Sequence, residues 1–266
     1  MKQCVFELKS YRKSFFFWLL GLSIFMVLIM MEFSAYRNNP ELLEILDVMP
    51  VELLEAFGLL GANLTTISGF VSITLVYLQL MLAIYAAMLG VTILSKESKW
   101  KTVDFLYVMP RSRRHIVTVK FVSGLMLISL MLLSVVAIFA LIALRYDPEP
   151  SFWSYLWRSH GSMYLILLMF YGFGFALSAI LKYSNVASAI AAISAFFFYL
   201  LSVLINLVES LEWLEPVSVF SYVSFSELIE SRGWPISTMM ISLGFVCFCF
   251  GLSIFIYPKV DLGVSR

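Results

Sequence analysis

The feature that most constrains this 266-residue chain is a series of long, uncharged apolar stretches separated by short polar segments. A helix needs about 20 apolar residues to cross the hydrocarbon core of a bilayer, where every backbone polar group must be bonded within the segment. Six stretches reach or approach that length: residues 15–31, 69–94, 121–144, 161–181, 186–208 and 236–257. We therefore predict an all-α integral membrane protein, with residues 1–266 forming a single transmembrane domain of six spanning helices.

Composition supports the same class. Hydrophobic residues make up 61% of the chain and charged residues 13%, whereas soluble domains have about 45–50% and 25%. Three cysteines, Cys4, Cys247 and Cys249, form no disulfide or metal-ligand pattern, so no metal site is predicted. The two histidines, His115 and His160, have no partner at a recognisable spacing and are expected at the surface.

The basic residues predict the orientation. If the loops alternate between the two sides and the N-terminus is inside, 14 of the 18 Lys and Arg residues lie on the inner side. The outer side keeps only Arg37, Arg145, Arg158 and Arg232. Short cytoplasmic loops are enriched in Lys and Arg, so both termini are expected in the cytoplasm.

Polar segments next to the spans suggest further helices. Residues 1–14 are expected to form an amphipathic helix on the inner surface, with Val5, Phe6 and Leu8 apolar. The outer segment from Asn39 to Phe57 has a helix-start signal and alternating leucines and acids, which predict amphipathic outer helices. A second outer segment, residues 209–235, carries aromatic residues suited to the membrane interface: Trp213, Phe220, Tyr222, Phe225 and Trp234. These segments either cap the bundle or form an outer gate.

The spans themselves carry little chemistry. The six apolar stretches contain no Asp, Glu, Lys, Arg or His, which argues against an ion-coupled pump or an intramembrane enzyme, and no catalytic residue is predicted. Gln79, Tyr85 and Asn206 are the polar candidates for lining a substrate path, and the alternative is that they form interhelical hydrogen bonds. Small residues at 187, 191 and 195 predict close helix packing, within the chain or with a second copy.

The most informative polar segment lies between the second and third spans, from Ser95 to Lys120. It is too short to be a domain, and the chain has no phosphate-binding loop, so any ATPase must be another polypeptide. Trp100, Val103 and Leu106 recur at helical spacing, and Pro110 ends the pattern. A short amphipathic helix held beneath the membrane is well shaped to enter a groove of a soluble partner.

This segment resembles the coupling-helix segment of ABC-2 type exporter permeases. The matching positions are Lys96-Glu97, Thr102, Asp104, Leu106, Pro110, Ser112-Arg113 and Lys120, whereas Lys101 stands where the family usually has Gly. The similarity extends over the whole chain through the order of the spans, the tight turn at residues 182–185 and the outer stretch LEWLEPVSVFSY. The sequence is most similar to small stand-alone permeases of bacterial exporters, including those associated with β-exotoxin and antimicrobial peptides.

The resemblance implies a transporter subunit in the bacterial cytoplasmic membrane, not an enzyme. Residues 97–109 would be the coupling helix, and the residues implied in ATPase coupling are Glu97, Trp100, Thr102, Val103, Asp104, Leu106, Pro110 and Arg113. The implied partners are an ABC ATPase that binds ATP and Mg, a second or related permease and membrane lipids, but no nucleic acid. This chain itself would hold no cofactor.

The expected cargo is an amphipathic peptide, toxin, drug or lipid-like molecule that is moved out of the cell. The alternative function is that of a membrane immunity or sensor protein, which would bind a peptide or toxin at its acidic outer face without transporting it. Co-purification with an ATPase would distinguish the two.

Overall fold

Long helices make up the architecture. The computed structural model describes residues 2–37, 39, 48–50, 54, 63–99, 112–181, 184–225, 227–230 and 236–257, and these contain no β-strand. Six helices in this part of the chain are long and apolar enough to cross a membrane. They are α1 (Lys2–Arg37), α4 (Ile67–Lys99), α6 (Arg113–Ala143), α7 (Pro150–Ile180), α8 (Ser184–Leu207) and α10 (Ile236–Ile256). The short helices are η1 (Leu144–Tyr146), η2 (Glu209–Val217), η3 (Val219–Tyr222) and α9 (Glu227–Glu230). The prediction of an all-helical membrane protein with six spans is confirmed.

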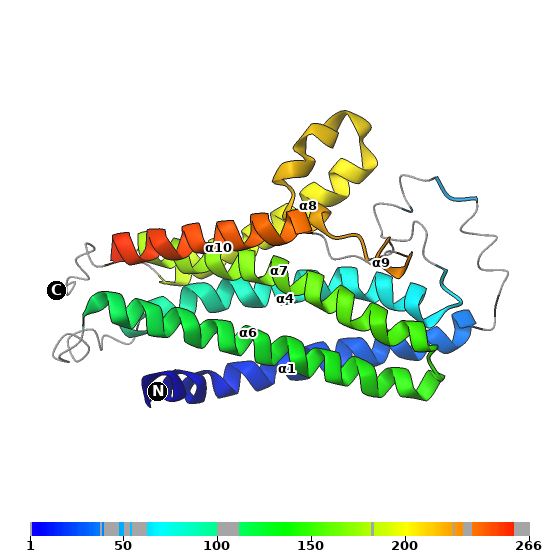
Figure 1. Cartoon of the computed structure of the whole chain (residues 1–266), viewed down its shortest axis with the longest axis horizontal. Coiled ribbons are helices and arrows are strands. Elements are labelled where there is room, and N and C mark those ends of the chain that lie inside the picture. The colour runs from blue at the N-terminus through cyan, green and yellow to red at the C-terminus, as the bar shows by residue number, and fades with distance from the viewer. Residues whose placement is uncertain are drawn as a thin grey trace.

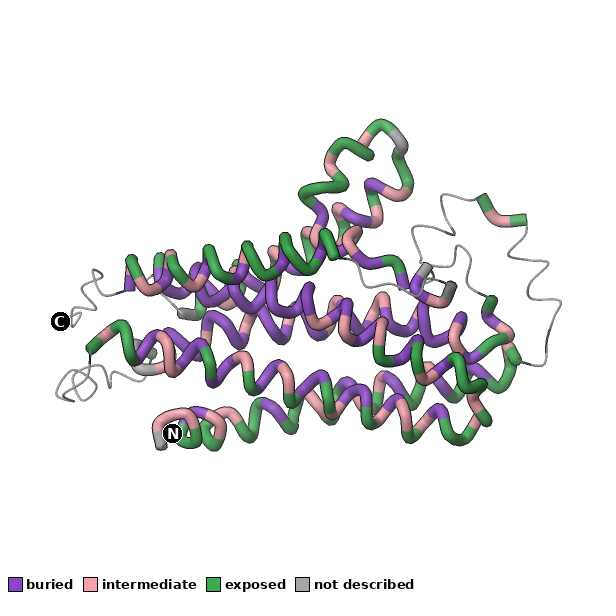
Figure 2. Tube along the Cα trace, viewed as in Figure 1, coloured by how far each residue is buried: buried purple, intermediate pink, exposed green. Residues whose placement is uncertain are grey.

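Helix α7 is the centre of the bundle. It packs against α4, α6, α8 and α10. In its most apolar 18-residue segment 78% of the residues are buried, compared with 22% in the corresponding segments of α1, α8 and α10. Figure 2 shows the buried residues concentrated on α7 and on the helix faces that turn toward it. The opposite faces of α1, α8 and α10 expose large side chains such as Phe17, Phe197 and Phe248. In a membrane these faces must meet lipid or another protein.

Helices α4 and α7 touch through their backbones. A methyl group added at Gly174 would overlap the carbonyl oxygen of Ala87, and one added at Gly90 would overlap that of Tyr171. Glycine is therefore required at both positions, because any larger side chain would force the two helices apart. Small residues at helix interfaces permit this close approach in membrane proteins.

The alanines of α8 also pack within the chain. Ala187, Ala191 and Ala195 are completely buried, and the main neighbour of α8 is α4. The four-residue spacing that predicted close packing therefore serves the fold of a single chain.

The helices differ in length, and this divides the bundle into two ends. Helix α1 begins and α10 ends at one end, which we call the base; the opposite end we call the head (Figure 1). Helix α10 has 21 residues, or about 31 Å, close to the roughly 30 Å thickness of a hydrocarbon core. Gly172 of α7 lies against Val246 and Cys249 of α10, and the Ser242 hydroxyl donates to Met169 Sδ at 3.3 Å. This register leaves about a dozen residues of α7 extending beyond α10 at the head.

Aromatic residues fill the core of the head. The ring of Phe33 lies 5.2 Å from that of Phe70 and 5.1 Å from that of Tyr146, and the Tyr146 hydroxyl donates to the carbonyl of Met30 at 2.6 Å. These contacts join α1, α4 and η1. The His160 ring lies 5.7 Å from the Phe139 ring, so α6 and α7 also meet here.

Two expectations differ from the structure. His160 is buried, with 1% of its surface exposed, and its Nδ1 lies 2.8 Å from the Leu156 carbonyl, so the prediction of a surface histidine is wrong for this residue and confirmed only for the exposed His115. The reason is that α7 continues past the apolar stretch into the head, where its neighbours cover it. The expected N-terminal helix is present, but it is continuous with the first span, so residues 2–14 form the first turns of α1.

The outer segments are described only in part. Residues 40–47, 51–53 and 55–57 of the first one lie outside the described residues. In the second, Trp213 is exposed, whereas Phe220 and Phe225 are buried, and the Phe220 ring lies 5.3 Å from that of Phe170. The Tyr222 hydroxyl donates to the Pro216 carbonyl, and burial raises the pKa of this phenol. Trp234 lies outside the described residues.

Candidate functional site

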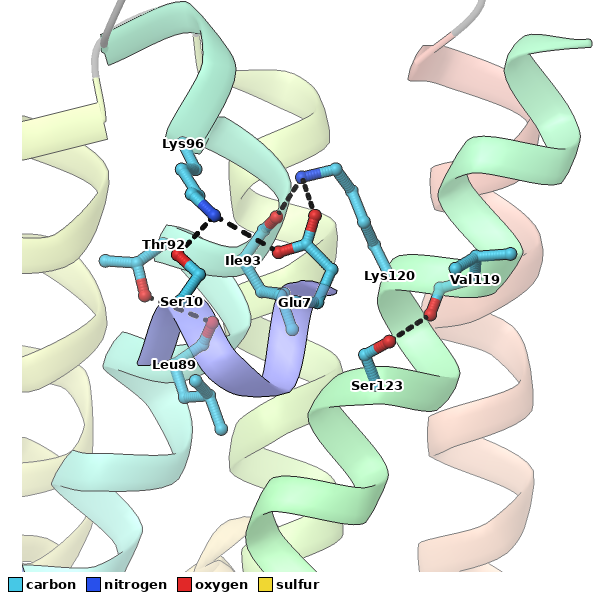
Figure 3. A network of polar contacts seen from close by, with 9 residues as sticks. All are labelled: Glu7, Ser10, Leu89, Thr92, Ile93, Lys96, Val119, Lys120 and Ser123. Atoms are coloured by element: carbon cyan, nitrogen blue, oxygen red, sulfur yellow. Dashed lines mark hydrogen bonds and ion pairs between the residues drawn. The ribbon is translucent and has the colours of Figure 1, made fainter. Parts of the chain in front are cut away.

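A carboxylate at the base lies between two lysine ammonium groups from different helices. Glu7 of α1 has its Oε2 3.5 Å from Lys96 Nζ of α4 and its Oε1 3.6 Å from Lys120 Nζ of α6. Figure 3 shows the three side chains converging, with the carboxylate between the two nitrogens. One residue of α1 is therefore paired with both helices that border the segment between residues 99 and 113. We call Glu7, Lys96 and Lys120 the base triad.

The triad is mostly removed from solvent. The Lys120 side chain is completely buried, that of Glu7 is 3% exposed and that of Lys96 is 20% exposed. Desolvating such an ion costs several kcal/mol unless further polar groups compensate it. Lys120 Nζ accordingly also donates to the carbonyl of Ile93 at 2.6 Å, and Lys96 Nζ donates to the Ser10 hydroxyl.

Aromatic rings complete the surroundings of the more exposed lysine. Lys96 Nζ lies 5.1 Å from the centroid of the Phe6 ring and 5.5 Å from that of the Tyr11 ring. An ammonium at this distance from a ring face is attracted to its negative centre. Lys96 is thus held by four side chains of α1: Phe6, Glu7, Ser10 and Tyr11.

Helical periodicity explains why these groups meet. Residues three or four apart lie on the same helix face, which aligns Glu7 with Ser10 and Tyr11 on α1 and Ile93 with Lys96 on α4. Helix α6 begins after Ser112, whose hydroxyl accepts a hydrogen bond from the backbone N–H of His115 at 3.3 Å. This N-cap sets the start of α6 and so the phase at which Lys120 faces the bundle.

The predicted coupling residues lie between Lys96 and Lys120 of the base triad in the sequence. Arg113 is half-buried and opens α6. The others lie outside the described residues: the side chain of Glu97, and Trp100, Thr102, Val103, Asp104, Leu106 and Pro110 entirely. The ends of α4 and α6 that enclose them are both described, and both contact α1. The assignment of the segment to ATPase coupling remains a prediction.

Two of the three path candidates lie on α4 and the third lies on α8. Gln79 is 2% exposed within the bundle, and its amide nitrogen has no hydrogen-bond partner among the described residues. Tyr85 is 4% exposed and its ring lies 5.6 Å from that of Trp18. Asn206 is half-buried near the end of α8. Their role in a path remains a prediction.

The expectation that ionisable groups are absent holds for the apolar stretches but not for the helices that contain them. Lys120 directly precedes the third stretch and His160 the fourth, and both are buried on helices that begin earlier than the stretches do. In the sequence Glu7 is a single acid among the basic residues near the N-terminus. The signal available in the sequence was the closing Lys of the family motif, whereas nothing in the sequence pointed to its pairing with Glu7.

The family of the chain follows from its sequence as a whole. The ABC-2 family transporter protein model matches residues 7–262. The chain therefore belongs to the ABC-2 family of transporters and is a membrane-spanning permease of this family, not itself a catalytic subunit. A comparison with curated proteins finds no match.

Proposed function

We propose that this permease is the transmembrane subunit of an ATP-driven exporter, coupled to a separate ATPase through residues 97–109. The observation that carries the proposal is the base triad, because it anchors both helices that flank this segment to the bundle. Family membership supports it as well, since permeases of the ABC-2 family generally work with an ATPase subunit.

In this proposal the base faces the cytoplasm of a bacterial cell. Lys9, Arg12 and Lys13 are exposed on the first turns of α1, and Arg114 is exposed at the start of α6. Basic residues at one end of a helical bundle favour the cytoplasmic side and attract anionic headgroups. The head, where Asp147 and Glu149 are exposed, would then face outward.

The transport cycle would use two copies of the chain, or this chain and a related permease. ATP-driven closure of two ATPase subunits would press on the coupling segments and tilt the helix bundles, opening the path on the outer side, a rigid-body change between two states. The uncharged apolar helices favour an amphipathic or lipid-like cargo, such as a peptide, toxin or drug.

Co-expression with candidate ATPases tests the proposal. The purified permease should bring down an ATPase with bound ATP and Mg, and in liposomes the complex should hydrolyse ATP. Reversing the charge of Glu97 together with Trp100→Ala should weaken complex formation at least about tenfold, the loss expected when a central aromatic anchor is truncated.

Arg145→Glu serves as the control, because it reverses an exposed charge in the head, at the other end of the molecule. It should leave complex formation unchanged. If the Glu97 and Trp100 variant binds the ATPase as well as the parent does, the coupling segment is assigned incorrectly. If no ATPase accompanies the permease, a non-transporting protein that binds peptides at its outer face becomes the better interpretation.

A further inference from the structure

We infer that Glu7 is a positioning residue that transmits displacement of the coupling segment to α1, and that α1 carries this displacement to the head. The inference rests on the proposed function, since it assumes that the segment between α4 and α6 is pushed by an ATPase. It assigns to the first helix a task that its sequence did not reveal.

The geometry at the base supports a mechanical link. The two carboxylate oxygens of Glu7 are divided between the flanks of the segment: Oε2 faces Lys96 of α4 and Oε1 faces Lys120 of α6. Lys120 also donates to the Ile93 carbonyl, so it joins α6 to both α1 and α4. A displacement of either flank therefore acts on α1 through a charged contact that is shielded from water.

The base triad contains two ion pairs, Glu7–Lys96 and Glu7–Lys120, which we call its two arms, and they differ in exposure. Lys120 is completely buried, whereas one-fifth of the Lys96 side chain reaches the surface. Water can replace the carboxylate around Lys96 more readily than around Lys120, because the Lys120 side chain is shielded from solvent. The Lys96 arm is thus the one that can lengthen during a cycle, while the Lys120 arm keeps α1 and α6 together.

Helix α1 is long enough to carry the displacement across the bundle. It runs without interruption from Lys2 to Arg37. At the head its residues Met30, Phe33 and Tyr36 contact Tyr146 and Phe70, which belong to η1 and α4. The same helix is therefore fixed at the base by charge and at the head by aromatic packing.

A variant that removes the charges of Glu7 and Lys120 but keeps their side-chain volumes distinguishes a loss of transmission from a loss of stability. Glu7→Leu combined with Lys120→Met replaces a buried ion pair by apolar side chains of similar size, a change that proteins often tolerate without loss of stability. With the ATPase partner bound in liposomes, we expect the complex to form and to hydrolyse ATP. Transport of a fluorescent amphipathic peptide per ATP should fall about tenfold, a typical size for coupling between sites.

A distance measurement reports the transmission directly. Spin labels at Ser34→Cys on α1 and Ser154→Cys on α7, in a background without the native cysteines, lie on exposed positions of the head. In the parent complex their separation should change on ATP addition with vanadate, and in the Glu7→Leu, Lys120→Met complex it should not. An equal change in both complexes would overturn the inference.

Two controls make each outcome decisive. Glu32→Gln alters an exposed acid of the same helix near the head and should leave transport per ATP unchanged. If the double variant does not reach the membrane, Glu7→Gln carries the test, because it removes the charge that faces both lysines and keeps the side-chain volume, and unchanged coupling in it would equally refute the inference. Failure of the parent chain to bind an ATPase would instead refute the proposed function.

Discussion

Single buried polar groups hold the helices of this permease in register. Tyr171 of α7 is completely buried, and its hydroxyl donates to the carbonyl of Phe121 on α6 at 2.9 Å. Gly124 lies directly beside this ring, where a side chain would overlap the phenol. The bond thus joins two helices inside an apolar core, where an unmade hydrogen bond has no water to replace it.

Replacing Tyr171 by Phe should therefore lower the stability of the bundle. The Phe121 carbonyl loses the hydrogen bond that it accepts from Tyr171, which lowers the free energy of unfolding by about 1–2 kcal/mol. Thermal unfolding in detergent should show a reduced Tm. Tyr164→Phe is the matched control: the Ser129 hydroxyl, its partner at 2.7 Å, keeps a bond to the Leu125 carbonyl, so a smaller reduction is expected. Equal effects would show that the buried bond from Tyr171 to Phe121 has no more weight than the partly buried one between Tyr164 and Ser129.

At this scale the sequence predicts less than the structure shows. Because apolar stretches are defined by the absence of charge, the predicted third and fourth spans begin only after Lys120 and His160. Both side chains are nevertheless buried in the bundle. The partner of Lys120 is Glu7, more than a hundred residues away in the chain. Neither hydropathy nor helical periodicity contains information about such a pairing, because each describes one helix at a time.

Among the elements, α4 and α7 form the tightest pair, and two glycines permit it. The helices meet where Gly90 lies against the Tyr171 carbonyl and Gly174 against the Ala87 carbonyl. Hydropathy predicted both spans, but not that α7 would be central or that it would begin at Pro150. The polar residues Ser151, Ser154 and Arg158 lower the hydropathy of its first turns without preventing a helix, which has Pro in its first turn, where proline is tolerated.

Gly174→Ala should disrupt this pair. The new methyl group would overlap the Ala87 carbonyl, and overpacking of this kind costs about 1–3 kcal/mol. We expect a lower Tm and less folded protein in the membrane. Gly244→Ala on α10 is the control, since nothing lies within 4 Å of the added carbon. It should be neutral or slightly stabilising, because alanine favours a helix by about 1 kcal/mol over glycine. Comparable losses in both variants would refute the packing argument.

For the whole molecule, the unequal helix lengths imply that part of the bundle stands outside the membrane. If α10 spans the hydrocarbon core, the first turns of α7 and the aromatic core around Phe33 project beyond it on the outer side. Trp157 is exposed on α7 close to that boundary, where tryptophan is enriched in membrane proteins. The loop charges had already predicted which end faces inward, whereas the projection depends on helix packing.

Labelling of single cysteines in intact cells tests this arrangement. In a background without the native cysteines, Ser154→Cys should react with a membrane-impermeant maleimide added outside. Lys9→Cys, exposed at the base, should react only after the cells are permeabilised. Gly244→Cys lies on the face of α10 that points away from the bundle and into lipid, so it should react poorly in both cases. Labelling of Lys9→Cys from outside would reverse the orientation, and protection of Ser154→Cys would place the head within the bilayer.

The backbone contact between α4 and α7 also limits how a transport cycle can proceed. Two helices whose backbones meet at Gly90 and Gly174 cannot rotate or slide past each other unless they first separate. Helix α8 packs on both of them, so their separation would also disturb its contacts. These three helices should therefore move as one rigid block. In an assembly of two permeases, the width of the cargo path would then be set by the distance between two such blocks, and not by rearrangement inside either of them.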